Sequence, residues 1–220
     1  MRIPSEVQEI LKRKAYHEQK AFYLKQLLEK YPDNPLILEF MRAEEYLMKK
    51  KGFKAAKVYE GICAKVGDLR WLVERQARTL AKYAYQDIGS GPIDKAHMLF
   101  TRKLGEDPLK AWKKIADILK RVKGWGYSAQ CYANADMPGT AARMFEKQLK
   151  QPQKAAWYYE QAEEWLPAAR MYKKAKLFDK AGECYTRAGM LKNAVKQWKK
   201  AGTLAKHNIG EQVMEQILRK

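Results

Sequence analysis

Residues 155–201 read AAWYYEQAEEWLPAARMYKKAKLFDKAGECYTRAGMLKNAVKQWKKA. In this stretch an alanine is followed by an aromatic residue four positions later and by another alanine three positions after that. The pattern begins at Ala155, Ala168, Ala181 and Ala194, at a regular spacing of 13 residues. Positions i, i+4 and i+7 share one face of an α-helix. Each unit therefore predicts a short helix that buries an aromatic ring between two small residues.

The same pattern extends toward the N-terminus as Ser128-Tyr132-Ala135 and Ala141-Phe145-Gln148, in which Gln148 is the one misfit. One step is longer by a residue, and we place the extra residue in the connection Lys150-Gln151-Pro152-Gln153. A helix of about ten residues is only ~15 Å long and is not stable alone in water. We therefore expect six brief helices between about 127 and 202, paired into three stacked antiparallel hairpins.

The first half predicts longer helices. Ser5 and Gln8 suggest a capping box for a helix that reaches Lys30. Asn34 can cap, and Pro35 can open, a second helix to about Lys50. Further helices are expected at 53–65, 68–86, 93–104 and 108–122, and a terminal capping helix at 209–219. No segment alternates with a period of two for long enough to indicate a strand.

At this point the residues resemble a known family. Pro32-Asp33-Asn34-Pro35, Gly52-Phe53, and then Ala55, Tyr59 and Ile62 resemble a tetratricopeptide repeat that lacks one residue before its second helix. Ala96, Phe100 and Pro108 repeat the motif's small, aromatic and proline spacing, although Lys103 stands where a small residue is usual. The 13-residue series is similar to the compact repeats of soluble NSF attachment proteins, intraflagellar-transport subunits and coatomer-type solenoids. The resemblance covers most of residues 31–202 and implies a scaffold or adaptor.

The expected fold is all-α, an α-solenoid of stacked antiparallel helix hairpins that forms a TPR-like superhelix. Residues 1–126 form the part with longer helices. Residues 127–220 form the part with short repeats and the capping helix, and the two parts are expected to make one continuous solenoid. The fold carries no function of its own.

Composition bounds the partner class. The 220 residues include 44 basic and 25 acidic side chains, for a formal charge of +19, and 46% are hydrophobic. No run of apolar residues is long enough to span a membrane, and the first residues lack an apolar signal core. The cysteines Cys63, Cys131 and Cys184 are odd in number and widely spaced, as expected of reduced thiols. These features predict a cytoplasmic protein.

Signatures of enzymes are absent from the sequence, which has no Walker loop, GxGxxG, HExxH or GxSxG motif. His17, His97 and His207 are isolated, and the pairs Glu44-Glu45 and Glu163-Glu164 are adjacent, so their side chains diverge on a helix. We therefore expect no catalytic site, metal, cofactor or small-molecule substrate.

A basic stripe on the helix at 68–86 is the first candidate partner site. Trp71, Arg75, Arg78 and Lys82 lie at i, i+4, i+7 and i+11, opposite an apolar face. Placed there, the cations need not be buried, and their reversal to glutamate is expected to leave stability nearly intact. The indole suits stacking on a nucleobase or covering an acidic peptide. The alternative is a solvated face with a partly packed Trp71.

Two further basic features follow along the chain. The first is a cluster that interleaves cations with aromatic residues near a turn: Lys110, Lys113, Lys114, Lys120, Arg121, Lys123, Trp125 and Tyr127. Such a cluster can bind RNA, although Trp125 can equally serve as a plug that packs between repeats. The second is a ladder two residues beyond each repeat aromatic, which is expected to point outward and is otherwise an ordinary solvated surface: Lys147, Gln161, Lys174, Arg187 and Lys200.

The leading hypothesis is a non-enzymatic helical-repeat adaptor that binds an acidic protein or a larger assembly. Residues 1–110 hold 22 basic and 15 acidic side chains, and residues 111–220 hold 22 and 10, so the short repeats carry the larger positive excess. The alternative is an RNA- or ribonucleoprotein-associated scaffold. Its contacts would be directed at the backbone, because Lys outnumbers Arg and acts on phosphate as a point charge. Attachment to a membrane surface is disfavoured, because Glu6, Glu9, Glu18 and Glu29 interrupt the basic residues of the first helix.

Overall fold

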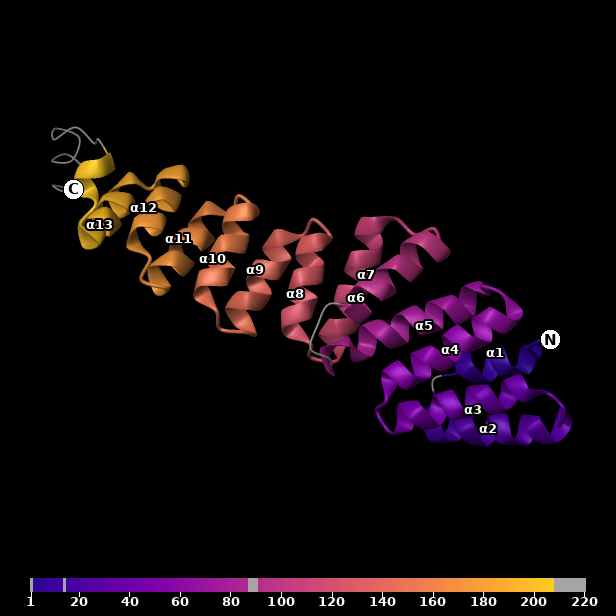
Figure 1. Ribbon diagram of the computed structural model, residues 1–220. Coiled ribbons are helices and arrows are strands. Elements are labelled where there is room, and N and C mark those ends of the chain that lie inside the picture. Colours follow the sequence, from indigo (N-terminus) through magenta and orange to yellow (C-terminus); the bar gives the residue numbers. More distant parts are fainter. Residues whose placement is uncertain (1, 14, 87–90, 208–220) are drawn as a thin grey trace. The chain divides into compact units, whose positions relative to one another are not determined.

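The computed structural model describes residues 2–13, 15–86 and 91–207, and these residues contain helices and turns but no β-strand (Figure 1). The chain divides into two compact units, Met1–Gly124 and Trp125–Lys220. Within each unit consecutive helices pack against one another. The expected all-α stack of helix hairpins is therefore confirmed, whereas a single continuous solenoid stays a prediction. No helix in the described part of the chain is long and apolar enough to span a bilayer.

The first unit contains the longer helices. Their bounds are α1 (Ser5–Lys12), α2 (His17–Lys30), α3 (Pro35–Met48), α4 (Gly52–Val66), α5 (Arg70–Tyr83), η1 (Ala84–Gln86), α6 (Gly91–Met98) with the π-helical turn η2 (Leu99–Lys103), and α7 (Pro108–Arg121). The predicted caps of α3 are present, since the Asn34 side chain accepts a hydrogen bond from the Leu36 amide at 3.1 Å and Pro35 opens the helix. Helix α5 packs against α4, α6 and α7 and so lies in the centre of the unit.

The predicted single helix from Ser5 to Lys30 is wrong. The chain breaks after Lys12 and begins again at His17, and α1 packs against α2. The Ser5 hydroxyl donates to Glu6 at 3.1 Å, and no side chain caps α1. The apolar stripe of α1 ends at Leu11, and a continued helix would present Glu18 on the same face. Folding back lets both short stripes be buried, which a single straight helix could not do.

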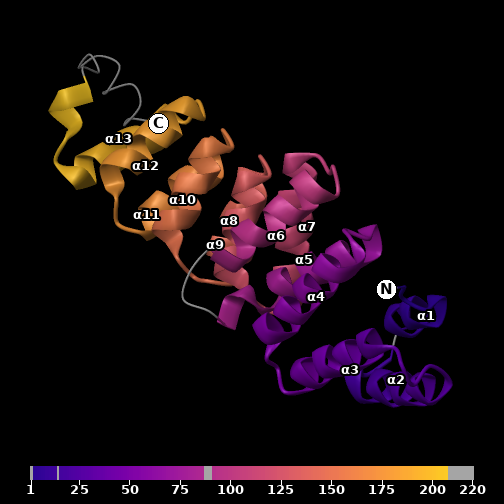
Figure 2. The ribbon, with the colours of Figure 1, turned by 45° about the vertical axis from the view of Figure 1, so that its right-hand side comes forward.

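The second unit contains the six short helices that the repeat predicted. They are α8 (Trp125–Asn134), α9 (Pro138–Lys147), α10 (Pro152–Gln161), α11 (Trp165–Lys174), α12 (Phe178–Arg187) and α13 (Leu191–Ala201), followed by the turn η3 (Leu204–His207). Each packs against the next, as Figure 2 shows. The six aromatic residues of the repeat are all buried, at 6% exposure or less. The expected capping helix at 209–219 lies outside the described residues.

Every connection in the second unit reverses the chain in the same way. The carbonyl of the repeat aromatic accepts a hydrogen bond from an amide just beyond the helix, for example Leu177 to Tyr172 at 2.9 Å and Met190 to Tyr185 at 2.8 Å. The residue before that amide has positive φ, as in Lys176 (61°) and Gly189 (72°). This is the Schellman arrangement, in which a left-handed residue lets the last carbonyls of a helix find donors. The extra residue predicted between α9 and α10 lies in such a turn, where Gln151 donates to Phe145 at 2.9 Å.

Candidate anion-binding pocket

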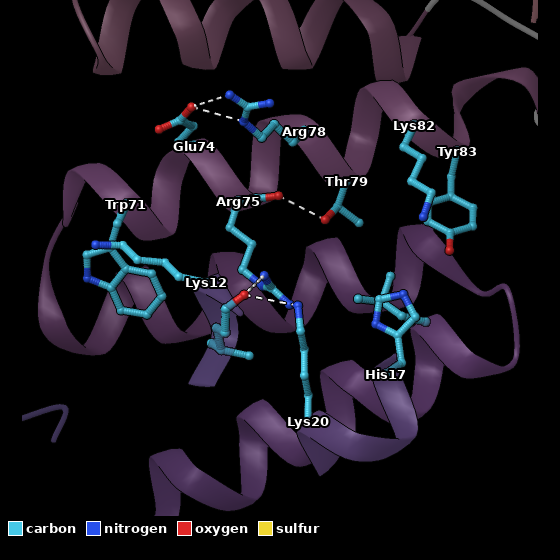
Figure 3. Close-up of a pocket in the computed structure, with 12 residues that line it drawn as sticks. Lys12, His17, Lys20, Trp71, Glu74, Arg75, Arg78, Thr79, Lys82 and Tyr83 are labelled. Carbon is cyan, nitrogen blue, oxygen red and sulfur yellow. Dashed lines mark hydrogen bonds and ion pairs between the residues drawn. The ribbon is translucent and has the colours of Figure 1, made fainter. Parts of the chain in front are cut away.

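The basic stripe of α5 lines a pocket. The buried side of α5 includes Leu72, Val73 and Ala77, and the opposite side turns Trp71, Arg75, Arg78 and Lys82 toward α1 and α2. Together these helices enclose a cavity of about 410 Å³ whose lining also includes Leu11, Lys12, His17, Lys20, Leu47, Glu74, Thr79 and Tyr83. Figure 3 shows the side chains of Arg75 and Lys20 pointing toward each other across it. The stripe is therefore a wall of a concave site.

Glu44 lies beneath this pocket with no exposed surface. His17 Nδ1 lies 2.6 Å from one of its carboxylate oxygens, Tyr59 donates to the other at 3.2 Å, and Arg75 also pairs with it. Burial by itself would raise the pKa of Glu44, but the hydrogen bond with His17 and the charge of Arg75 outweigh burial, so its pKa is lowered. Glu44 is an ionised, fully paired carboxylate in the core of the first unit.

Arg75 is held by the protein on several sides, and its predicted exposure is wrong. Its Nε donates to the Tyr59 hydroxyl at 2.9 Å and its Nη1 to the Leu11 carbonyl at 3.1 Å, besides the pair with Glu44. The side chain is 20% exposed. Helical spacing placed Arg75 on the right face, but α1 and α2 cover that face. Arg75 is therefore a structural cation that also lines the pocket.

Lys20 is a second cation that sequence reasoning missed. It is 8% exposed, and its Nζ donates at 3.0 Å to the same Leu11 carbonyl that Arg75 uses (Figure 3). That carbonyl lies in the last turn of α1, where helix carbonyls lack partners within the helix. Burial lowers the pKa of Lys20, and the positive charge of Arg75 lowers it further. The pocket thus crowds two cations around one carbonyl.

The remaining stripe residues are more exposed. Arg78 donates two hydrogen bonds to Glu74, at 2.7 and 2.9 Å, and its side chain is 48% exposed. Lys82 is exposed, and its ammonium lies 5.3 Å from the ring centroid of Tyr83. Trp71 is half-buried and stacks on Phe40, with ring centroids 5.9 Å apart. One face of Trp71 is therefore packed, while the residue still lines the pocket.

Positive charge exceeds negative charge around the cavity. Its described lining contains five cations, namely Lys12, Lys20, Arg75, Arg78 and Lys82. Glu74 is the one carboxylate among the described lining residues, and it is shared by Arg78 and by Lys114, whose Nζ lies 3.4 Å away. Beneath the cavity, the buried carboxylate of Glu44 offsets part of the positive charge of Arg75. The described lining therefore carries a net positive charge.

The second predicted cluster is divided between the two units. Lys114 Nζ forms an ion pair with the Glu106 carboxylate at 2.8 Å and lies 4.6 Å from the ring centroid of Phe100. The outward side of α7 and the turn that follows carry the exposed cations Lys113, Lys120, Arg121 and Lys123. Trp125 is the first residue of α8 and belongs to the other unit.

The outward ladder is confirmed as a surface, since its members Lys147, Gln161, Lys174, Arg187 and Lys200 are all exposed. Two of them lie over aromatic rings: Arg187 is 4.6 Å from the ring centroid of Trp165, and Lys200 is 5.9 Å from that of Phe178. The three cysteines are buried free thiols, and burial raises the pKa of Cys63 and of Cys184 to about 11. No group of metal-binding side chains gathers within the described ranges.

Sequence reasoning missed the pocket residues Lys12, His17 and Lys20, and also Glu44, which pairs with Arg75 and His17. One feature of the sequence indicates a buried charged network: Glu44 falls on the apolar face of α3, beside Phe40 and Leu47. A carboxylate in such a stripe requires a buried partner, but the sequence does not say which cation supplies it. Comparison with known proteins adds nothing here: no protein-family model and no curated protein matches this chain.

Proposed function

We propose that this chain is a non-enzymatic helical-repeat adaptor that binds an acidic segment of a protein partner in the basic pocket of the first unit. The observation that carries the proposal is a cavity whose described lining gathers five cations from three helices and a single carboxylate. Such a cavity concentrates positive potential and favours an anionic partner. The sequence contains no catalytic motif that would use the same pocket for a reaction.

Lys20 supports the proposal on energetic grounds. Its charge is disfavoured by burial and by the nearby charge of Arg75, and an arriving carboxylate would offset both effects. The exposed cations Lys12, on α1, and Lys82, on α5, line the same cavity. A peptide with several carboxylates can therefore reach exposed charges at the rim and buried charges within. Three buried thiols fit a cytoplasmic location, which stays a prediction.

The test is a binding titration with a defined probe. We expect a fluorescein-labelled oligoglutamate to bind the full chain, while the matching oligoglutamine does not. The double variant Lys12→Gln, Lys82→Gln should weaken oligoglutamate binding by about tenfold, equivalent to about 1.4 kcal/mol. The matched control is Lys25→Gln, Lys57→Gln, which removes two exposed lysines of the same unit that lie outside the pocket. Equal weakening by both double variants would overturn the assignment to this pocket.

A further inference from the structure

Two repeats of the second unit hold a carboxylate against a tyrosine hydroxyl. Tyr159 donates to Glu146, and Tyr172 donates to Glu160, each at 2.6 Å. In both cases the carboxylate follows directly after the aromatic residue of the preceding helix, Phe145 or Tyr159. The stacked helices therefore place a negative oxygen beside the hydroxyl of the next repeat, at a recurring position.

The next repeat breaks this arrangement. The position that follows Tyr172 is Lys173, so Tyr185 faces a lysine where its predecessors have a glutamate. Tyr185 is 6% exposed and lines a cavity, and its hydroxyl forms no hydrogen bond with any residue in the described part of the chain. The hydroxyl of a largely buried tyrosine normally donates to a protein group or to solvent. The Tyr185 oxygen keeps some exposed surface, unlike Oε1 of Gln197. The hydroxyl of Tyr185 therefore lacks the carboxylate partner of the two preceding repeats and is accessible beside the cavity.

The cavity beside Tyr185 is lined by cations. Its volume is about 620 Å³, and its described lining is Lys173, Tyr185, Asn193, Lys196, Gln197, Lys199 and Lys200, from α11, α12 and α13. No carboxylate is among these residues, and none of the four lysines forms an ion pair with a described side chain. Gln197 is 5% exposed and its Oε1 also lacks a hydrogen-bond partner. This second pocket offers positive charge and two polar groups without partners.

We infer that this pocket binds the sugar-phosphate backbone of single-stranded RNA. A phosphate oxygen accepts the Tyr185 hydroxyl, in the place that Glu146 and Glu160 occupy in the two preceding repeats. The four lysines supply the charge that binds phosphate, and their lack of the rigid guanidinium fork makes the contact independent of base sequence. The amide of Gln197 can turn about its last torsion, which has broad preferences, and accept from a ribose 2′-hydroxyl.

RNA fits these residues better than a phosphorylated peptide does. Phosphopeptide sites are typically built from arginines that grip one phosphate in a bidentate manner, and all four lining cations here are lysines. The lining lysines come from two helices, Lys173 from α11 and Lys196, Lys199 and Lys200 from α13. A polymer of phosphates can engage such a distribution, whereas a single phosphate cannot.

The test uses a variant that restores the pattern of the other repeats. Lys173→Glu places a carboxylate where Glu146 and Glu160 stand, so it should keep or raise the melting temperature and weaken binding of a labelled oligouridylate by at least about tenfold. The matched control is Lys174→Glu, which makes the same charge change on the adjacent exposed lysine outside the cavity. It should weaken binding by no more than about threefold. Equal losses would show general electrostatics only and overturn the site.

Three further measurements sharpen the test. Tyr185→Phe removes only the hydroxyl and should weaken oligouridylate binding about tenfold, the effect of one hydrogen bond to a charged oxygen. The slope of log affinity against log salt should fall by about 0.7 when Lys173 no longer neutralises a phosphate. The corresponding oligodeoxynucleotide should bind more weakly, because it lacks the 2′-hydroxyl. Equal RNA and DNA affinity, or binding of a phosphoserine peptide in place of RNA, would overturn the assignment.

This inference stands apart from the proposed function. The two pockets lie in different units and share no residue. Lys173→Glu should therefore leave oligoglutamate binding at the first pocket unchanged, and the Lys12→Gln, Lys82→Gln variant should leave Tyr185-dependent RNA binding unchanged. The two sets of variants therefore test the two proposals separately, and one proposal can fail while the other stands.

Discussion

Arg75 of α5 reaches across the first unit to the fully buried carboxylate of Glu44 on α3. The pair joins two helices that are not consecutive, and His17 brings the start of α2 to the same carboxylate at 2.6 Å. Removing one member of a buried ion pair leaves the other charge uncompensated. The stability of the first unit therefore depends on a contact that also forms the floor of the candidate site.

Glu44→Gln should destabilise the first unit by about 3–5 kcal/mol, because Arg75 and His17 lose a buried negative partner. Amide hydrogen exchange in α3 and α5, compared with α11 and α12 as an internal reference, measures the effect within one molecule. Unchanged protection of α3 would contradict the assigned role of Glu44.

Acid should weaken the same network. The pKa of Glu44 lies below the ordinary value of 4.5 in the folded chain, so the carboxylate binds a proton less readily when folded than when unfolded. Its contribution to stability is complete above that ordinary value and is lost as the pH falls through the lowered folded value. The Glu44→Gln variant should show a flatter dependence of melting temperature on pH below about 4.5. Identical acid profiles of the two proteins would exclude this linkage.

Arg75 and Lys82 should respond differently to substitution, although both belong to the basic stripe. Arg75→Met should destabilise the first unit by about 3–5 kcal/mol through the stranded Glu44, whereas Lys82→Glu should change stability by no more than about 1 kcal/mol. Chemical denaturation of both variants tests this difference. A joint reversal of the stripe cannot separate binding from folding, since it includes Arg75.

The Tyr172 ring should be a principal determinant of stability in the second unit, because it is 1% exposed. Tyr172→Ala should cost about 3–5 kcal/mol. Tyr172→Phe removes only the hydrogen bond to Glu160 and should cost about 1–3 kcal/mol. A melting temperature unaffected by Tyr172→Ala would contradict the inward position of the repeat aromatics.

The short repeats could be predicted from sequence because their signal is local. Ala168, Tyr172 and Ala175 lie within two helical turns, so the face they share follows from helix geometry alone. The end of α1 at Lys12 and the burial of Arg75 could not be predicted in this way. Both depend on which helix packs against which, and residues such as Leu11 and Arg75 are far apart in the sequence.

The two candidate sites also differ in how much of each could be predicted from the sequence. The stripe from Trp71 to Lys82 was visible because it lies on one helix. Lys20 lines the same pocket from α2, and Glu44 pairs with Arg75 from α3. The second pocket is visible only once the hydrogen bonds of Tyr159 and Tyr172 are known. After that, Lys173 stands out as the residue that departs from the repeat.

The turns of the second unit provide the last prediction. Lys176 and Gly189 occupy equivalent positions in successive Schellman turns, with φ of 61° and 72°. A left-handed conformation costs a residue with a Cβ atom about 1–2 kcal/mol, and glycine avoids this cost but loses more backbone entropy on folding, by about 0.5–1 kcal/mol. Lys176→Gly should therefore raise the stability of the second unit by up to about 1 kcal/mol. Gly189→Ala should lower it by a similar amount, since a Cβ there meets no atom within 4 Å and only the backbone preference changes. Thermal denaturation of the two single variants should thus shift in opposite directions, and shifts of the same sign would show that the equivalence of the two turns is wrong.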